Sequence, residues 1–119
     1  MTIESIRAYC LGKKGAAEGC PFGETVLVFS VMGKMFALTS PDDIPPSVNL
    51  KCDPERAVEL RERYTAVQPG YHMNKKHWNT VIIDGSIPQR EILEMIDHSY
   101  DLVVKGLKKA DREQLQKEG

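Results

Sequence analysis

The sequence contains 119 residues, of which 41% are hydrophobic and 28% are charged, and its formal net charge is −1. These values are those of one ordinary globular domain, and they exclude a disordered chain. The pI of about 6.3 also excludes a protein that is basic throughout, so any binding to nucleic acid would need a local basic patch.

Three cysteines, Cys10, Cys20 and Cys52, are odd in number, and no two of them have C-x-x-C spacing. This pattern argues against a disulfide framework and against a structural zinc site. The N-terminal residues lack the apolar segment of a signal peptide, and no apolar run reaches the roughly 18 residues that cross a bilayer. We therefore expect reduced thiols and a cytoplasmic protein without a membrane partner.

The first third of the chain predicts a helix followed by a β-hairpin. Residues 2–11 carry apolar side chains at helical spacing, whereas residues 13–23 contain repeated glycines and are predicted to form a loop. The runs 25–31 and 34–40 have the composition of strands. Gly33 lies between them and can adopt the positive φ that a tight hairpin turn requires.

The rest of the chain predicts a strand, a helix, a further strand and a long helix. The expected boundaries are a strand at 48–52, a helix at 54–64, an irregular stretch at 65–77, a strand at 78–83 and a helix at 88–107. Asp53 is a strong N-cap, and Pro54 suits the first position of the helix that follows. The charged segment 108–119 is expected to fray outside a single domain that spans 1–107.

The fold class follows from this order of elements. Strands joined by hairpins, with helices between the blocks, predict a two-layer α+β domain in which helices cover one face of an antiparallel sheet. The expected order is α-β-β-β-α-β-β-α, where the block before the last helix holds one or two strands.

The segment from Pro69 to Trp78, with the sequence PGYHMNKKHW, combines lysines, histidines, an amide and aromatic rings within ten positions. This mixture suits phosphate contacts combined with stacking on a base or sugar. The structural alternative is that Tyr71 and Trp78 belong to the core and that Asn74 shapes a turn. Both interpretations stay open at this stage.

Catalytic and metal-binding patterns are absent from the sequence. His72 and His77 have no further zinc ligands at short spacing. Cys52 falls on the apolar face of its strand, and Cys20 lies in a glycine-rich loop without a base at a known offset. No carboxylate pair is placed for acid–base catalysis. We therefore expect no enzyme activity, no cofactor and no metal.

Five segments of the chain together resemble the MmcQ/YjbR family. They are 33–37 (GKMFA), 49–54 (NLKCDP), 69–81 (PGYHMNKKHWNTV), 84–86 (DGS) and 97–103 (DHSYDLV). The resemblance extends over nearly the whole chain, from about residue 6 to residue 107. It implies a bacterial protein with a CyaY-like or secretion-chaperone-like fold, built on an antiparallel sheet. The family is commonly labelled DNA-binding, through a double-wing interpretation of its hairpins, and the resemblance implies no catalytic residues.

The function predicted from these observations is non-catalytic DNA binding, with phosphate contacts made by the hairpin and the 70–78 loop. The predicted nucleic-acid-binding residues are Lys34, Tyr71, His72, Asn74, Lys75, Lys76, His77 and Trp78. The first alternative is a protein-interaction or chaperone-like module. The second is a small-molecule or enzymatic site at the same loop. The sequence leaves open whether the protein is a monomer or a dimer.

Overall fold

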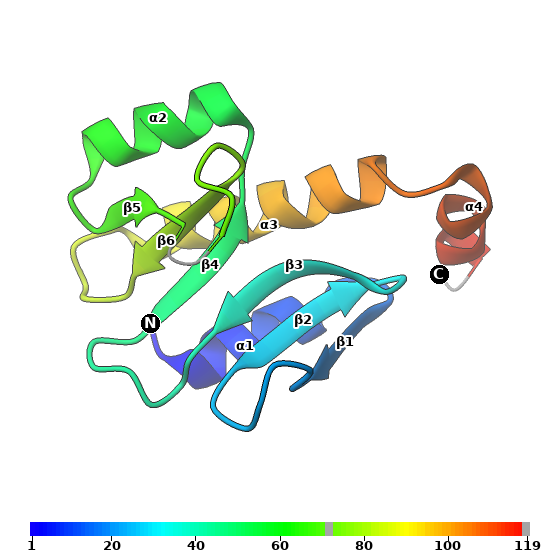
Figure 1. Cartoon of the computed structure of the whole chain (residues 1–119), viewed down its shortest axis with the longest axis horizontal. Helices are drawn as coiled ribbons and strands as arrows, with labels where there is room; N and C mark the ends of the chain where they lie inside the picture. The colour runs from blue at the N-terminus through cyan, green and yellow to red at the C-terminus, as the bar shows by residue number, and fades with distance from the viewer. Residues whose placement is uncertain (71–72, 118–119) are drawn as a thin grey trace.

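The computed structural model describes residues 1–70 and 73–117. Within this part of the chain, four helices accompany one antiparallel sheet of six strands (Figure 1). The elements are α1 (Ile3–Leu11), β1 (Ala16–Gly19), β2 (Leu27–Val31), β3 (Lys34–Thr39), β4 (Ser47–Lys51), α2 (Pro54–Arg63), β5 (Val67–Pro69), β6 (Trp78–Ile82), α3 (Gln89–Lys105) and α4 (Lys109–Lys117). The predicted α+β class with an antiparallel sheet is confirmed.

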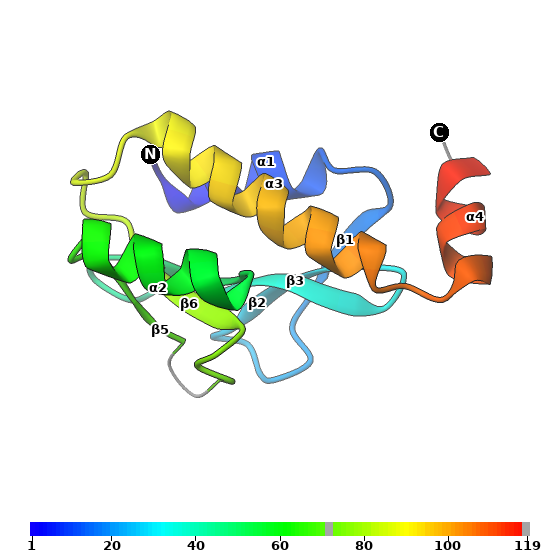
Figure 2. The same ribbon diagram turned by 90° about the horizontal axis from the view of Figure 1, so that it is seen from above.

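The sheet has the strand order β1-β2-β3-β4-β6-β5, and every neighbouring pair is antiparallel. Helices α1 and α3 lie side by side on one face of this sheet (Figure 2). Helix α2 lies on the same side of the sheet as α3 (Figure 2), and its Leu60 belongs to the same buried core cluster as Met95 of α3 and Leu50 and Val81 of the strands. The opposite face of β2, β3 and β4 carries no helix, and two loops project from it (Figure 2).

The core lies between the helices and the sheet. Phe29 and Phe36 are fully buried there, together with Ile96 of α3. The Ser99 hydroxyl donates to the carbonyl of Phe36 at 2.5 Å and accepts from the N–H of Lys51 at 2.9 Å. This side chain therefore attaches α3 to β3 and β4 at once, and both of its polar contacts are buried or partly buried.

The N-terminal half contains one strand more than predicted. The segment 13–23 was expected to be a loop, but Ala16–Gly19 pairs with β2 as an edge strand. Alanine and glycine have low strand propensity, so the composition of this segment does not favour a strand. The strand is instead stabilised by its pairing with β2 and by the ion pair between Arg7 and Glu18. The hairpin turn is confirmed, with Gly33 at φ 79°.

The C-terminal segment also differs from its prediction. Residues 108–119 were expected to fray, but the structure places Lys109–Lys117 in helix α4. Leu115 is 4% exposed in the core cluster and gives this polar helix an apolar anchor. A single apolar residue among charged ones gives little signal in the sequence, which explains the wrong prediction. None of the described helices is both long and apolar enough to cross a membrane.

Candidate nucleic-acid interface

The described part of the predicted binding loop, Met73 to Trp78, is organised by hydrogen bonds within the loop itself. The Asn74 side chain accepts from the N–H of Lys76 at 2.9 Å. Its main-chain carbonyl accepts from the N–H groups of His77 at 3.2 Å and Trp78 at 2.9 Å. Asn74 therefore shapes the turn, as the structural alternative proposed. The predicted residues Tyr71 and His72 lie outside the described residues.

Lys75 is also engaged with its own loop. Its ammonium group donates to the carbonyl of Gly70 at 3.1 Å, and its main-chain carbonyl accepts from the Arg61 guanidinium of α2. Arg61 additionally donates to the Asn79 side chain of β6 at 2.7 Å. Sequence analysis did not single out Arg61, because it sits in a run of alternating charges that is typical of a solvated helix face.

Gly70 occupies a position where no side chain fits. A Cβ atom there would lie 2.8 Å from the Cβ of Trp78 and 3.0 Å from its carbonyl oxygen. The N–H of Gly70 donates to that same carbonyl at 2.9 Å, so the backbones of the loop's two ends lie against each other. The spacing of glycine and tryptophan in the motif is therefore explained by the closure of the loop.

The structure does not bring all the predicted residues to one place. Trp78 and Lys51 are cross-strand neighbours at the end of the sheet from which the 73–78 loop projects. Lys76 is exposed in that loop. Lys34 instead lies at the β2–β3 hairpin, which is at the same end of the molecule as α4 (Figure 1). The hairpin and the loop therefore form two separate surfaces.

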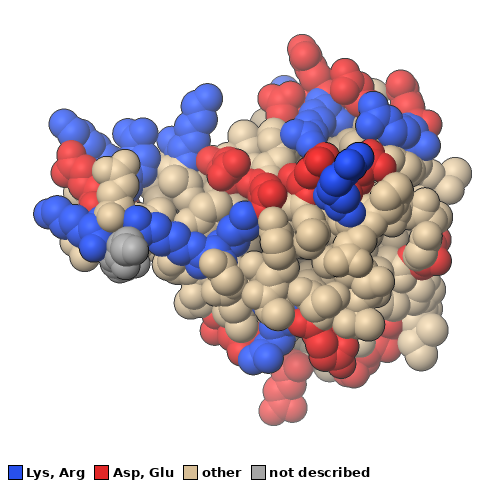
Figure 3. Space-filling model, turned by 180° about the vertical axis from the view of Figure 1, so that it is seen from behind, with Lys and Arg blue, Asp and Glu red and all other residues tan. Residues whose placement is uncertain are grey.

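A concentration of positive charge lies elsewhere, around α4 and the end of α3, on the face that Figure 3 shows. We call this surface the basic end and define it by Lys14, Lys34, Lys105, Lys108, Lys109, Arg112 and Lys117. Within the described residues, none of these seven side chains forms a salt bridge. Apart from Lys34, sequence analysis missed these residues because it assigned most of them to a frayed tail. The signal that could have identified them is the cluster of five Lys and Arg between residues 105 and 117.

The basic end is held to the domain by polar contacts as well as by its buried leucine. The Lys14 ammonium donates to the carbonyl of Gln116 at 2.9 Å, and the Tyr100 hydroxyl donates to the carbonyl of Lys14 at 2.6 Å. Tyr100 in turn packs edge-on against Phe36, with ring centroids 5.4 Å apart. The loop after α1, helix α3 and helix α4 are therefore joined at this end.

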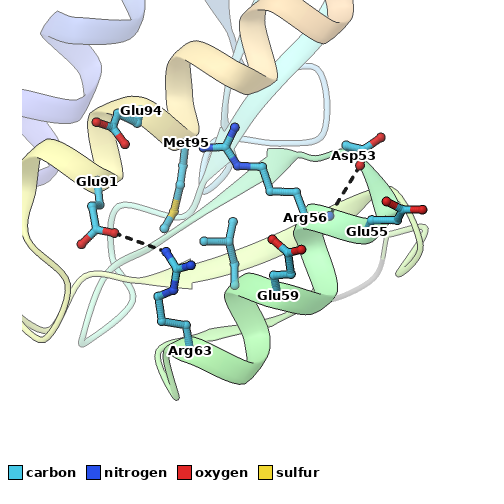
Figure 4. Close-up of a pocket in the computed structure, with 9 residues that line it drawn as sticks. Asp53, Glu55, Arg56, Glu59, Arg63, Glu91, Glu94 and Met95 are labelled. Carbon is cyan, nitrogen blue, oxygen red and sulfur yellow. Dashed lines mark hydrogen bonds and ion pairs between the residues drawn. The ribbon is translucent and has the colours of Figure 1, made fainter.

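A second charged region, between α2 and α3, has the opposite character (Figure 4). It is a hollow of about 260 Å³ that five carboxylate side chains and two arginines line. Arg63 lies 3.8 Å from Glu91, and the Tyr64 hydroxyl also donates to Glu91, a bond that raises the pKa of Tyr64. The excess of carboxylates makes this hollow unfavourable for phosphate.

The described residues provide few groups for nucleophilic or metal chemistry. Burial raises the pKa of the Cys10 thiol to about 12 and that of the Cys52 thiol to about 11, which disfavours the reactive thiolate. Among the described residues, no group of three or more His, Cys, Asp and Glu side chains could hold a metal ion. Cys20 is exposed.

Comparison with known proteins gives one consistent result. A family model described as YjbR matches residues 11–102. The uncharacterised protein YjbR of Escherichia coli strain K12 is 36% identical over 115 residues, which cover 97% of this chain and 98% of that protein. The uncharacterised protein YbdF of E. coli O157:H7 is 40% identical over 95 residues, or 80% of this chain and 78% of that protein.

Solved structures agree with these sequence matches. The crystal structure of Deinococcus radiodurans protein DR2400, which has the family domain DUF419, superposes with a TM-score of 0.90 at 41% identity, covering 97% of this chain and 88% of that one. A crystal structure of a Pseudomonas syringae protein gives a TM-score of 0.75 at 29% identity, over 86% of this chain and 98% of that one.

Proposed function

The chain belongs to the YjbR family, and from this starting point we propose that it is a non-catalytic DNA-binding protein that contacts phosphates mainly through the basic end. The observation that carries the proposal is the uneven distribution of charge. Residues 105–117 contain five Lys and Arg but only two Asp and Glu, although the whole chain has a net charge of −1. Local positive potential of this kind attracts a polyanion even when the net charge of the protein is near zero.

The position of the cations on α4 supports a binding role over a structural one. Lys108 and Lys109 lie at the N-terminus of the helix, where Lys108 contributes the carbonyl that accepts from the N–H of Arg112 at 3.0 Å. Cations at a helix N-terminus oppose the helix dipole and destabilise the helix. An anion that binds there is instead favoured both by the lysines and by the free N–H groups of the first turn.

Lys34 remains part of the proposed interface, because its hairpin lies at the same end of the molecule as α4 (Figure 1). The loop contributes less in this proposal. Asn74 and Lys75 already hydrogen-bond within the loop, which leaves Lys76 as the freely exposed lysine among the loop residues that the structure describes. Trp78 and His77 are half-buried and complete the exposed surface next to it.

The test is fluorescence anisotropy with a labelled DNA duplex at about 50 mM and about 200 mM salt. The full-length protein is compared with Lys109→Gln/Arg112→Gln and with Lys76→Ala. We expect the wild type to bind without sequence preference, with a Kd on the order of 10⁻⁶ to 10⁻⁴ M near physiological salt. The double variant should bind roughly tenfold more weakly at low salt. Its plot of log affinity against log salt concentration should have a slope smaller in magnitude by about two, because each lost phosphate contact reduces that slope by about one.

The matched control is Arg63→Gln/Arg90→Gln, which removes two exposed, ion-paired positive charges near the start of α3, at the end of that helix away from α4 (Figure 1). This variant should retain most of the wild-type affinity. An absence of DNA binding by the wild type at low salt contradicts the proposed function. Equal losses in the two double variants would contradict the basic end as the contact surface, since the effect would then follow net charge alone.

A further inference from the structure

The face of the sheet opposite the helices carries an apolar surface that DNA binding does not explain. Cross-strand pairing places Leu38 next to Asn49 on this face, and Met35 lies two pairs further along β3, where it pairs with Ser30 after a shift in register. The loop before β2 and the loop before β6 project on either side of it (Figure 2). In a sheet that faces only water, these outward positions would be expected to be polar.

The two loops and the strands between them enclose a concave space of about 520 Å³, which we call the open-face hollow. Its apolar lining consists of Phe22, Val26, Met35, Leu38 and Met73, and its polar lining consists of Ser40, Asp43 and Asn49. Asn49 already donates to the carbonyl of Leu38 at 3.5 Å and accepts from the Thr80 hydroxyl. The floor of the hollow is therefore effectively apolar, with its amide satisfied by the protein.

The apolar surface continues beyond the hollow. Phe22 is 65% exposed at its edge, and Ile44, next to Asp43, is 97% exposed. Exposed apolar residues that adjoin a concave apolar patch are typical of a protein-binding surface, whereas a small ligand would leave such outlying side chains in water. The two methionines add an adaptable lining of the kind found where varied apolar side chains are bound.

The charges at the rim of the open-face hollow determine which partner fits. Asp43 of the β3–β4 loop lines it, and two further carboxylates are exposed nearby in the chain, Asp42 in the same loop and Glu24 in the loop before β2. Among the described residues that line the hollow, none is a lysine or an arginine. This acidic rim repels nucleic-acid phosphates. It also disfavours a symmetric dimer through this face, because each copy would place its carboxylates against those of the other.

We propose that the open-face hollow binds an apolar segment of another protein that carries lysine or arginine beside its apolar side chains. The apolar residues enter between Phe22 and Met73, and a neighbouring cation meets Asp43. This proposal does not rest on DNA binding, because none of the residues that line the hollow belongs to the basic end and its rim is acidic. Burial of the aromatic and methionine side chains supplies affinity, and the acidic rim supplies selectivity.

The test uses NMR of the full-length protein labelled at its methionine methyl groups and titrated with three short peptides. One alternates leucine with lysine, one alternates leucine with glutamate and one alternates serine with lysine. We expect the leucine–lysine peptide to bind and to shift the methyl signals of Met35 and Met73, but not that of the buried Met95. The other two should bind at least about tenfold more weakly, since the leucine–glutamate peptide lacks the cations that would meet the acidic rim and the serine–lysine peptide lacks the apolar side chains that would enter the hollow.

Substitutions then test the location of the site. Phe22→Ser, in an exposed loop where folding is not at risk, and Met35→Glu should each weaken binding of the leucine–lysine peptide by about tenfold. Val58→Ser is the matched control, because Val58 is 48% exposed on α2 and lies outside the hollow. Failure of the leucine–lysine peptide to bind, equal binding of the leucine–glutamate peptide, or an equal loss with Val58→Ser would each overturn the proposal.

Discussion

The 73–78 loop and the basic end both carry lysines, but the structure uses those lysines in different ways. In the loop, Lys75 and Asn74 form hydrogen bonds that shape the backbone. At the basic end, Lys109 and Arg112 form no salt bridge within the described residues, and Lys109 lies in the first turn of α4, where its charge opposes the helix dipole. The comparison teaches that a dense sequence motif can consist of residues that stabilise a loop, whereas a sparse run of charged residues can form a binding surface.

The sharpest way to test the structural role of the loop is Gly70→Ala. The added Cβ would lie 2.8 Å from the Cβ of Trp78, so the two ends of the loop must separate. We expect the free energy of unfolding to fall by about 2 kcal/mol, the middle of the range for overpacked sites. Urea denaturation measures this change. A stability equal to that of the wild type would show that the close approach is not needed for folding.

A smaller effect on the free energy of unfolding is expected when the hydrogen bonds from Arg61 of α2 to the loop and to β6 are removed. Arg61→Met keeps the aliphatic part of the side chain but leaves the side-chain carbonyl of the 2% exposed Asn79 without its guanidinium donor. We expect a loss of about 1 to 2 kcal/mol in the free energy of unfolding. The DNA affinity of the folded variant should not change. A large loss of DNA affinity without a loss of stability would instead make Arg61 part of the interface.

The stability of the α2 side should also depend on pH. Burial, with a smaller contribution from Arg56, lowers the pKa of His98, whose ring nitrogen accepts from the N–H of Asp53 at 3.2 Å. Because the unfolded chain binds the proton more tightly, this stabilisation is fully present above the unfolded pKa of about 6.5 and is lost as pH falls through the folded pKa. Urea denaturation from pH 7.5 to 5 should show the loss, and His98→Gln should lack this component. An identical pH dependence in the variant would contradict the assignment.

The smallest change in the free energy of unfolding is expected for a variant of the basic end, in contrast to the variants of the loop. Lys109→Gln/Arg112→Gln should leave the free energy of unfolding unchanged or raise it by a few tenths of a kcal/mol, because it relieves repulsion with the dipole of α4. The same variant is expected to lose DNA affinity. Thermal unfolding at low salt provides the measurement. A destabilisation above about 1 kcal/mol would mean that these side chains support the fold.

The sequence predicted the main elements because their signals are local. Asp53 and Pro54 predict the start of α2, and in the structure Asp53 is the N-cap of this helix. The turn at Gly33 is likewise confirmed by its positive φ. These features depend on the preferences of individual residues for particular backbone angles, which the sequence displays directly.

The remaining features could not be predicted because they depend on tertiary contacts. Strand β1 consists of residues with little strand propensity and exists through its pairing with β2. Helix α4 depends on one buried leucine that gives no periodic pattern. The loop was recognised as unusual, but whether its lysines face solvent or its own carbonyls was decided by Gly70 and Arg61. Charges spread over two loops and two helices become a single surface only after folding.

The anchoring of α4 has a consequence for amide hydrogen exchange. Leu115 is its buried residue within the described part of the chain, and the main-chain contact with Lys14 is exposed. An element held by so few contacts opens in a local fluctuation that leaves the sheet intact, so its amides should exchange far faster than those of α3. A bound polyanion would slow that exchange, because binding adds its free energy to the closed state of this helix.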